Sequence, residues 1–199
     1  MAQVNSRDDT IAFADEVLIA RAQRGQMQAF GQLVVKYQDK LYNTALRLTG
    51  NQADALDLTQ EAFSKAIENL SRFQGRSGFY TWLFRIAVNL AMTRRRREAR
   101  RRTYVPSDGP TQAEDLINQM ADANVATAEE HALRQEQHQQ VQTTLLTLDD
   151  NQRAILVLRD VEDFSYVQIA EILDIPINTV RSRLHRARMA LREKLLRIF

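Results

Sequence analysis

The sequence predicts an all-α protein made of two small helical domains. Apolar residues recur at helical spacing through most of the 199 residues, and no stretch alternates in the way that marks a strand. Glycine and proline are scarce, at six and three residues, while unbranched side chains that suit helices are common. An acidic and weakly periodic segment divides the helical pattern in two, so we expect a flexible acidic linker there.

Composition sets the domain boundaries and excludes several classes of protein. We expect an irregular N-terminus over 1–12, a helical domain over 13–102, a linker over 103–130 and a second helical domain over 131–199. The absence of cysteine excludes disulfides, thiolate metal sites and cysteine nucleophiles. There is neither a secretory pattern at the N-terminus nor an apolar run of about 18 residues, so we expect a cytoplasmic protein without direct membrane insertion.

The first domain opens with helical periodicity from Asp15 to about Thr49. Gly25 is expected to divide this stretch into two helices. Gly50 follows the second of them, at the position after a helix where a left-handed backbone is wanted.

A third helix is predicted after Gly50, with Asn51 or Asp54 as its cap. Its apolar stripe comprises Ala55, Leu58, Ala62, Phe63, Ala66, Ile67 and Leu70. The loop over 71–78 contains two glycines, and a further helix starts at Phe79 and runs into a series of arginines.

The second domain is predicted to contain four helices. The first three cover about 129–148, 151–160 and 165–173, and Ser165 with Gln168 forms a capping box at the start of the third. A tight connection follows, and the fourth helix is expected to be capped by Asn178 or Thr179.

The last two helices have the spacing of a helix-turn-helix. One helix offers Ile169 and Leu173 for packing, and the next offers Val180 and Leu184. The opposite face of the last helix carries the polar residues Arg181, Ser182, His185, Arg186 and Arg188, which can lie in a major groove. An ordinary terminal helix with a solvated basic face is the alternative, but the turn, the caps and the one-sided charge together favour DNA recognition.

The segment from Phe73 to Phe84 is rich in aromatic residues and precedes a run of arginines. The rings belong to Phe73, Phe79, Tyr80, Trp82 and Phe84, and the arginines occupy 94–97 and 100–102. Ring faces can stack on unpaired bases and guanidinium groups can hold phosphates, so this pattern indicates contact with opened nucleic acid. The alternative is a core stripe, and we expect at least Phe79 and Trp82 to be partly buried. Asn89, further along the same helix, has an amide that can read a base edge.

Charge is distributed unevenly along the chain although the net charge is only +2. Residues 94–102 carry +6, residues 107–136 carry −6 and residues 178–199 carry +6. Two basic elements on one chain suggest two contacts with the same polyanion. The acidic segment between them is expected to avoid DNA, or to mimic it in a basic channel of a partner.

An acidic cluster on the third helix has three interpretations. Asp54, Asp57 and Glu61 share one face, with Gln60 beside them. They could hold a metal for a nuclease, form a solvated face, or dock on a basic or amide-rich partner. His131 and His138 have no third ligand type near them and are interpreted as surface residues. We expect no catalytic residue, no metal site and no cofactor, because no phosphate loop, nucleophile elbow or kinase signature occurs.

Four stretches together resemble a known family. They are AFGQLVVKYQDKLYNTALRLTG, DALDLTQEAFSKAIENL, FQGRSGFYTWLFRIAVNLA and SYVQIAEILDIPINTVRSRLHRARMALREKL. In this order and spacing they resemble the bacterial RNA polymerase sigma factors of the extracytoplasmic-function (ECF) group, which belongs to the sigma-70 family. The resemblance implies a promoter-specificity subunit with no catalytic site of its own, and the two predicted domains then correspond to sigma region 2 and sigma region 4.

The resemblance also implies a role for particular residues of region 2. Docking on the clamp of the largest subunit of core RNA polymerase is implied for Asp57, Gln60, Glu61 and Phe63. Recognition and melting of the −10 element of promoter DNA is implied for Phe73, Gln74, Arg76, Ser77, Tyr80, Trp82, Arg85, Asn89, Arg94 and Arg95. Extruding a base costs a few kcal/mol of stacking, which ring contacts and a positive groove can offset.

In region 4, recognition of the −35 element is implied for Arg159, Thr179, Arg181, Ser182, His185 and Arg186. The implied partners are core RNA polymerase, through its clamp and the flap of its second-largest subunit, promoter DNA and an anti-sigma factor. Family members often carry proline at the position of Asp149 and glycine at those of Asp163 and Asn178. Asp and Asn tolerate a left-handed backbone better than other non-glycine residues, so we expect the fold to be retained.

Two rival hypotheses stay open at this point. The chain could be a stand-alone repressor or activator that uses only its helix-turn-helix, but such a protein needs no ring-rich melting loop. It could also be a metal-dependent nuclease built on the acidic cluster, which divalent-metal binding would support.

Overall fold

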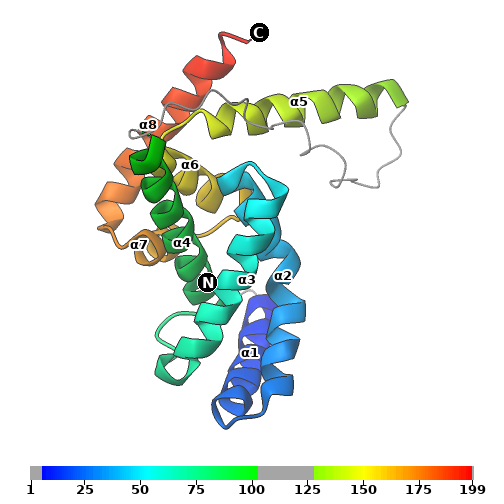
Figure 1. Ribbon diagram of the computed structural model, residues 1–199, viewed down its shortest axis with the longest axis vertical. Helices are drawn as coiled ribbons and strands as arrows, with labels where there is room; N and C mark the ends of the chain where they lie inside the picture. Colours follow the sequence, from blue (N-terminus) through cyan, green and yellow to red (C-terminus); the bar gives the residue numbers. More distant parts are fainter. Residues whose placement is uncertain (1–5, 103–127, 199) are drawn as a thin grey trace.

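The computed structural model describes residues 6–102 and 128–198, and every regular element in these two ranges is a helix (Figure 1). This confirms the predicted all-α class. The N-terminal half contains α1 (Ser6–Gln23), α2 (Met27–Thr49), α3 (Gln52–Asn69), the short 3₁₀ helix η1 (Leu70–Arg72) and α4 (Phe79–Arg102). The C-terminal half contains α5 (Ala128–Leu146), α6 (Asp150–Leu156), the π-helical turn η3 (Val157–Val161), α7 (Tyr166–Leu173) and α8 (Ile177–Leu195).

The predicted boundaries at the N-terminus and at the linker differ from the helices. Residues 6–12 were expected to be irregular, but α1 begins at Ser6. This segment has no apolar stripe, so periodicity did not mark it as a helix, but it holds no proline or glycine that would stop one. Most of the predicted acidic linker, residues 103–127, lies outside the described residues, and α5 starts at Ala128.

The junctions between the first three helices follow their local sequence signals. Gly25 separates α1 from α2 with φ of 88°, and Gly50 ends α2 with φ of 76° and an N–H bond to the Leu46 carbonyl at 2.8 Å. The Asn51 side chain then caps α3 by accepting the Asp54 N–H at 3.0 Å. These three predictions are confirmed.

The core of the N-terminal half lies where α2, α3 and α4 meet. Its fully buried side chains include Leu33, Leu41, Leu58, Leu83 and Phe84. Ile67, predicted as part of the apolar stripe of α3, is 39% exposed instead. It follows the buried Ala66 directly, and one residue of helix turns the side chain about 100° away from the buried stripe.

In the C-terminal half, α6, α7 and α8 enclose Ile155, Leu158, Ile169, Ile172 and Leu184. The predicted capping box at the start of α7 is present, because Ser165 accepts the Gln168 N–H and the Gln168 side chain accepts the Ser165 N–H. The second helix differs from its prediction. Asp149 caps α6 by accepting the Asn151 N–H at 2.9 Å, and the helix passes into a π-helical turn at Val157.

The turn before α8 corrects two predictions. The helix begins at Ile177 after Pro176, and neither Asn178 nor Thr179 caps it. Within the described ranges, the non-glycine residues with a left-handed backbone are Asp163, as expected, and Asp174 rather than Asn178. Pro176 is the N-cap residue, with φ of −59° and an extended ψ of 143°, and its carbonyl accepts the Thr179 N–H at 2.8 Å. The left-handed turn is therefore made at Asp174, before the helix begins.

The two halves pack on one another. Helix α4 lies against α7, and α2 lies against α5, α6 and η3 (Figure 1). A single cluster of buried apolar residues includes members of both halves, among them Phe84 and Phe164. Helix α5 projects from this body, and its C-terminal end meets α2 and α8.

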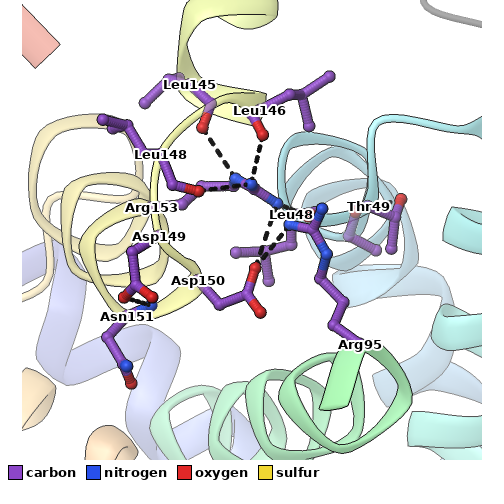
Figure 2. Close-up of polar contacts among 11 residues, drawn as sticks. Leu48, Thr49, Arg95, Leu145, Leu146, Leu148, Asp149, Asp150, Asn151 and Arg153 are labelled. Carbon is purple, nitrogen blue, oxygen red and sulfur yellow. Dashed lines mark hydrogen bonds and ion pairs between the residues drawn. The ribbon is translucent and has the colours of Figure 1, made fainter. Parts of the chain in front are cut away.

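Arg153 of α6 occupies the junction between the halves (Figure 2). It is 2% exposed, and its guanidinium donates to the carbonyls of Leu145 at 2.9 Å, Leu146 at 2.6 Å and Leu148 at 2.9 Å. Across the junction it donates to the Leu48 carbonyl at 2.8 Å. Carbonyls in the last turn of a helix lack intrahelical partners, so one buried cation satisfies the C-terminal ends of both α2 and α5.

We predict that Arg153→Met lowers the free energy of unfolding by about 3–5 kcal/mol, because it takes the guanidinium donor away from the buried carbonyls of Leu48, Leu146 and Leu148. Urea unfolding followed by circular dichroism measures the loss. Arg192→Met, at an exposed position on α8, is the matched control and should change stability by less than about 0.5 kcal/mol. Equal effects of the two variants would contradict the assigned role of Arg153.

A pair of glycine variants tests the packing of α5 on the end of α2. Gly25 and Gly50 both have positive φ, so alanine costs about 1–2 kcal/mol at either position. A Cβ at Gly25 meets nothing within 4 Å, whereas a Cβ at Gly50 lies 2.5 Å from Leu146 Cδ1. Thermal unfolding should therefore show a larger loss for Gly50→Ala than for Gly25→Ala, by about 1–3 kcal/mol. Similar losses would argue against this close approach.

Candidate nucleic-acid interface

The five aromatic residues predicted between Phe73 and Phe84 divide into two groups. Phe79 and Phe84 are buried, at 2% and 0% exposure, while Phe73, Tyr80 and Trp82 are partly exposed. The Trp82 ring lies 4.9 Å from the Phe73 ring and 5.7 Å from the Phe79 ring. The expectation that Phe79 and Trp82 are at least partly buried is confirmed, and Phe73 with Trp82 forms a ring pair at the surface.

Polar residues with accessible side chains accompany this ring pair. Arg85 and Asn89 follow Trp82 on α4 at spacings of three and seven residues, so the three share one face of the helix. Both are exposed. In the loop before α4, Gln74 and Arg76 are exposed and Ser77 is partly exposed, and Gly75 has φ of 68°. This face offers rings, an amide and cations together.

Tyr80 lies apart from the ring pair and faces the C-terminal half. Its ring stacks on Phe164 with centroids 4.8 Å apart and 20° between the planes. Its hydroxyl donates to Glu162 Oε2 at 2.9 Å, and Lys40 Nζ lies 4.9 Å from the ring centroid. Burial, together with the charge and hydrogen bond of Glu162, raises the pKa of the Tyr80 phenol, which therefore stays a neutral donor.

The first two arginines of the basic run are engaged in ion pairs. Arg94 contacts the Glu61 carboxylate of α3, with Nε 3.1 Å from Oε2. Arg95 donates to Asp150 Oδ1 of the C-terminal half at 2.7 Å. Arg96 and Arg97 are exposed. The side chains of 100–102 lie outside the described residues, although the backbone of α4 continues to Arg102.

Helix α8 presents the predicted polar face to solvent. Arg181, Ser182, His185 and Arg186 are all exposed, while Thr179 is partly exposed. The opposite face packs Val180, Leu184 and Ala187 into the core. One side of α8 is therefore fixed by packing and the other is exposed, as the helix-turn-helix pattern predicted.

Arg159 is tied to the segment before α7. Its guanidinium donates to Asp163 Oδ1 at 3.0 Å and to the Phe164 carbonyl at 2.9 Å, and it lies 5.6 Å from the Tyr166 ring centroid. These contacts hold the left-handed turn at Asp163 in place. Arg159 thus helps to position the start of α7.

The residues predicted to dock from α3 differ in their exposure and contacts. Asp57 and Gln60 are exposed, Glu61 is paired with Arg94, and Phe63 is only 8% exposed with its ring edge-on to Phe30. Phe63 thus supports α3 from within. Among the residues that the structure describes, no group of three or more acidic, histidine or cysteine side chains is placed to hold a metal ion.

Comparison with known proteins places these surfaces in a family. Residues 33–101 match the model of Sigma-70 region 2, and residues 138–191 match the model of Sigma-70, region 4. The RNA polymerase sigma-H factor of Pseudomonas aeruginosa is 39% identical over 180 residues, covering 89% of this chain and 91% of that protein. The ECF RNA polymerase sigma-E factor of Escherichia coli K12 is also 39% identical over 180 residues, covering 90% and 93%. The chain belongs to the ECF group of the sigma-70 family.

Solved structures of sigma factors share the fold. One is the sigma factor RpoE in complex with the anti-sigma factor NepR from Bartonella quintana, with a TM-score of 0.67 and 25% identity over 83% of this chain and 96% of that one. Another is CnrH in complex with the cytosolic domain of CnrY, with a TM-score of 0.64 and 28% identity over 92% and 97%. The family assigned from the sequence motifs is therefore confirmed.

The outer face of α3 carries Leu56, which the sequence reasoning missed, and Ile67, which it assigned to the buried stripe. Leu56 is 51% exposed and Ile67 is 39% exposed, and with Gln60 they lie on the outer face of α3 at spacings of four and seven residues. The outer face of α3 therefore carries exposed apolar side chains beside the amide of Gln60. The sequence held a signal for this exposed position, because Leu56 falls outside the apolar stripe.

No helix of the described residues is long and apolar enough to cross a membrane.

Proposed function

We propose that this sigma factor binds core RNA polymerase and directs it to promoters by reading a −35 element with α8 and opening the −10 element with the loop over 71–78 and α4. The main support for this proposal is that the chain, a member of the family, has two exposed polar faces of different chemistry. One is a recognition helix suited to intact duplex, and the other combines rings with an amide and cations.

The −35 contact rests on the exposed residues of α8. Arginine can donate two hydrogen bonds to a guanine edge, and serine and histidine can contact either bases or phosphates. The four residues follow one another at spacings of one, three and one, so they cover a strip of helix about a turn and a half long. Arg159 and Thr179 flank this strip and add phosphate contacts.

The −10 contact rests on Trp82, Phe73, Arg85 and Asn89. A base turned out of the duplex loses stacking and pairing, and aromatic faces restore the stacking at about 1–3 kcal/mol per base. Asn89 offers both a donor and an acceptor for a base edge. Gln74, Arg76 and Ser77 add contacts from the loop, where Gly75 lets the backbone approach a strand closely.

Docking on polymerase rests on the outer face of α3. Asp57 and Gln60 supply polar contacts, and the exposed Leu56 and Ile67 supply apolar area around them. Glu61 and Phe63 support this face from within the domain. Glu61 forms an ion pair with Arg94, and Phe63 packs against Phe30. The clamp of the largest subunit is the proposed partner here, and the flap of the second-largest subunit is the proposed partner of the C-terminal half.

The proposal also covers the regulation of this sigma factor and the compartment in which it acts. Since the sigma factor RpoE of Bartonella quintana is in complex with an anti-sigma factor, we propose that this chain also binds an anti-sigma factor.

We place this sigma factor in the cytoplasm, where core polymerase transcribes. It supplies promoter specificity, while the polymerase performs the chemistry.

Run-off transcription tests the proposal directly. Purified chain is added to bacterial core polymerase and a library of genomic promoter fragments, and the transcripts are sequenced. Discrete start sites that share a −10 and a −35 motif are expected, and core polymerase alone is the control. Failure of the chain to bind core polymerase refutes the proposal. Tight, sequence-specific duplex binding without polymerase favours a stand-alone regulator.

We predict that Trp82→Ala reduces opening of the −10 region about five- to a hundredfold, because a stacking face for an unpaired base is lost. Permanganate reactivity of −10 thymines measures opening, and the affinity for core polymerase should stay unchanged. Trp82→Phe keeps a ring beside Phe73 and is expected to retain most of the opening. Unchanged reactivity in Trp82→Ala would remove this residue from the melting surface.

We predict that Arg186→Ala weakens binding of the holoenzyme to promoters with a −35 element by about 1–3 kcal/mol, if the side chain is bidentate to a base. Gel-shift titration on matched promoters with and without that element measures the difference. Arg192→Ala, at an exposed position nearer the end of α8, controls for loss of one positive charge. An equal loss on both promoters would assign Arg186 to phosphate contact instead.

A further inference from the structure

The last residue of α1 is hydrogen-bonded to the segment that leads into the proposed −10 loop. Gln23 Nε2 donates to the Leu70 carbonyl at 2.9 Å and to the Phe73 carbonyl at 3.0 Å. These acceptors lie 47 and 50 residues further along the chain. A single amide group therefore joins the first helix to the start of η1 and to the residue that follows η1.

The two carbonyls lie where the helical backbone stops and the loop begins. Phe73 has φ of −70° and ψ of 118°, so the chain becomes extended there, and its N–H bonds to the Leu70 carbonyl at 3.1 Å. A carbonyl oxygen has two lone pairs, so the Leu70 oxygen accepts from Gln23 as well as from Phe73. Gln23 thereby fixes the backbone at the entrance of the loop.

Phe73 carries this backbone contact to the rings of the −10 surface. The centroid of its ring lies 4.9 Å from that of Trp82 and 6.1 Å from that of Phe79. In the part of the chain that the structure describes, residues 74–77 form no hydrogen bond with another segment, and open space surrounds Gly75. The loop is therefore held at its two ends, by the Gln23 amide before it and by the buried Phe79 after it.

Helix α1 is also tied to these rings at a second point. Asp15 is buried and accepts a hydrogen bond from the Tyr37 hydroxyl. Burial, together with the hydrogen bond and charge of Asp15, raises the pKa of the Tyr37 phenol, which therefore stays a neutral donor. The Tyr37 ring lies 5.8 Å from the Phe79 ring between centroids. The contact of Asp15 with Tyr37 fixes α1 on α2, and so fixes the place from which Gln23 acts.

We propose that Gln23 is a positioning residue for the −10 surface, which sets the place of Phe73 and so the face that the Phe73–Trp82 ring pair presents to an unpaired base. This inference rests on the proposed function of that surface. Gln23 lies outside residues 33–101, which match Sigma-70 region 2, so the family match assigns it no role. Gln23 acts through Phe73 and does not itself contact a base.

Two substitutions at Gln23 separate the donor from the size of the side chain. Gln23→Met keeps the length and the helix propensity but removes the amide, and Gln23→Glu keeps the shape but turns a charged acceptor toward two carbonyls. The matched control, Gln32→Met, makes the same change at an exposed position on α2.

The first measurement uses Trp82, which is the only tryptophan of the chain, as a reporter. Acrylamide quenching of its fluorescence in the free protein measures how accessible the ring is. Both Gln23 variants should raise the quenching constant, Gln23→Glu more than Gln23→Met, because Phe73 no longer covers the indole in every molecule. The control Gln32→Met should match the wild type. An unchanged constant in both Gln23 variants, or an equal rise in the control, overturns the proposal.

The second measurement is opening of the −10 region by the holoenzyme, followed as permanganate reactivity of its thymines. Gln23→Met should reduce opening about three- to tenfold, the factor that corresponds to the net contribution of one hydrogen bond, and Gln23→Glu should reduce it further. Affinity for core polymerase should stay at the wild-type value. A lower thermal midpoint with normal opening at temperatures where the variant is folded indicates a purely structural role and overturns the proposal.

These measurements separate this inference from the proposed function. If the wild type and both Gln23 variants open promoters equally with core polymerase, positioning by Gln23 is refuted and the proposed function stands. If the wild type opens no promoter but the quenching of Trp82 responds to Gln23 as expected, the hold of Gln23 on the ring pair is supported and the proposed function fails.

Discussion

The relation between the two halves depends on one buried cation. Arg153 donates to backbone carbonyls from two separate segments, the last turn of α2 and the end of α5 with the residues after it. Carbonyls at the end of a helix lack intrahelical partners, and leaving them buried and unpaired would cost more than the net gain of a single hydrogen bond. The place of Arg153 in α6 therefore fixes where α2 and α5 end relative to the helix-turn-helix. Asp150, 3.8 Å from the Arg153 guanidinium, extends the same network to Arg95.

The interior of each half and the contact between the halves differ in chemistry. Leucine, isoleucine and phenylalanine fill the core of each half, and Phe84 and Phe164 join the two cores across the contact. Between the halves, carboxylates, a guanidinium, hydroxyls and an amide face one another around a small group of rings. Polar contacts that replace equivalent contacts with water specify geometry more than they add stability.

The sequence predicted those features that depend on neighbours along the chain. Gly50, Asn51 and Ser165 act within a few residues, so their roles at helix ends were visible in the pattern. The exposed face of α8 followed from periodicity in the same way. The role of Arg153 could not be read, because its partner Leu48 is 105 residues away. The orientation of Tyr80 was hidden for the same reason, since Glu162 and Phe164 lie in the other half.

Tyr80 connects the packing of the halves to the proposed chemistry of the −10 surface. Burial, with the Glu162 carboxylate, raises the pKa of its phenol above the ordinary value of about 10. A group whose pKa is raised on folding contributes its full stability below its unfolded value and loses it only as the pH rises through the folded value. The phenol therefore keeps its hydrogen bond to Glu162 throughout the physiological range, and its ionisation does not open the contact. A ligand that binds only the separated halves opens it by mass action, in proportion to its concentration over its dissociation constant.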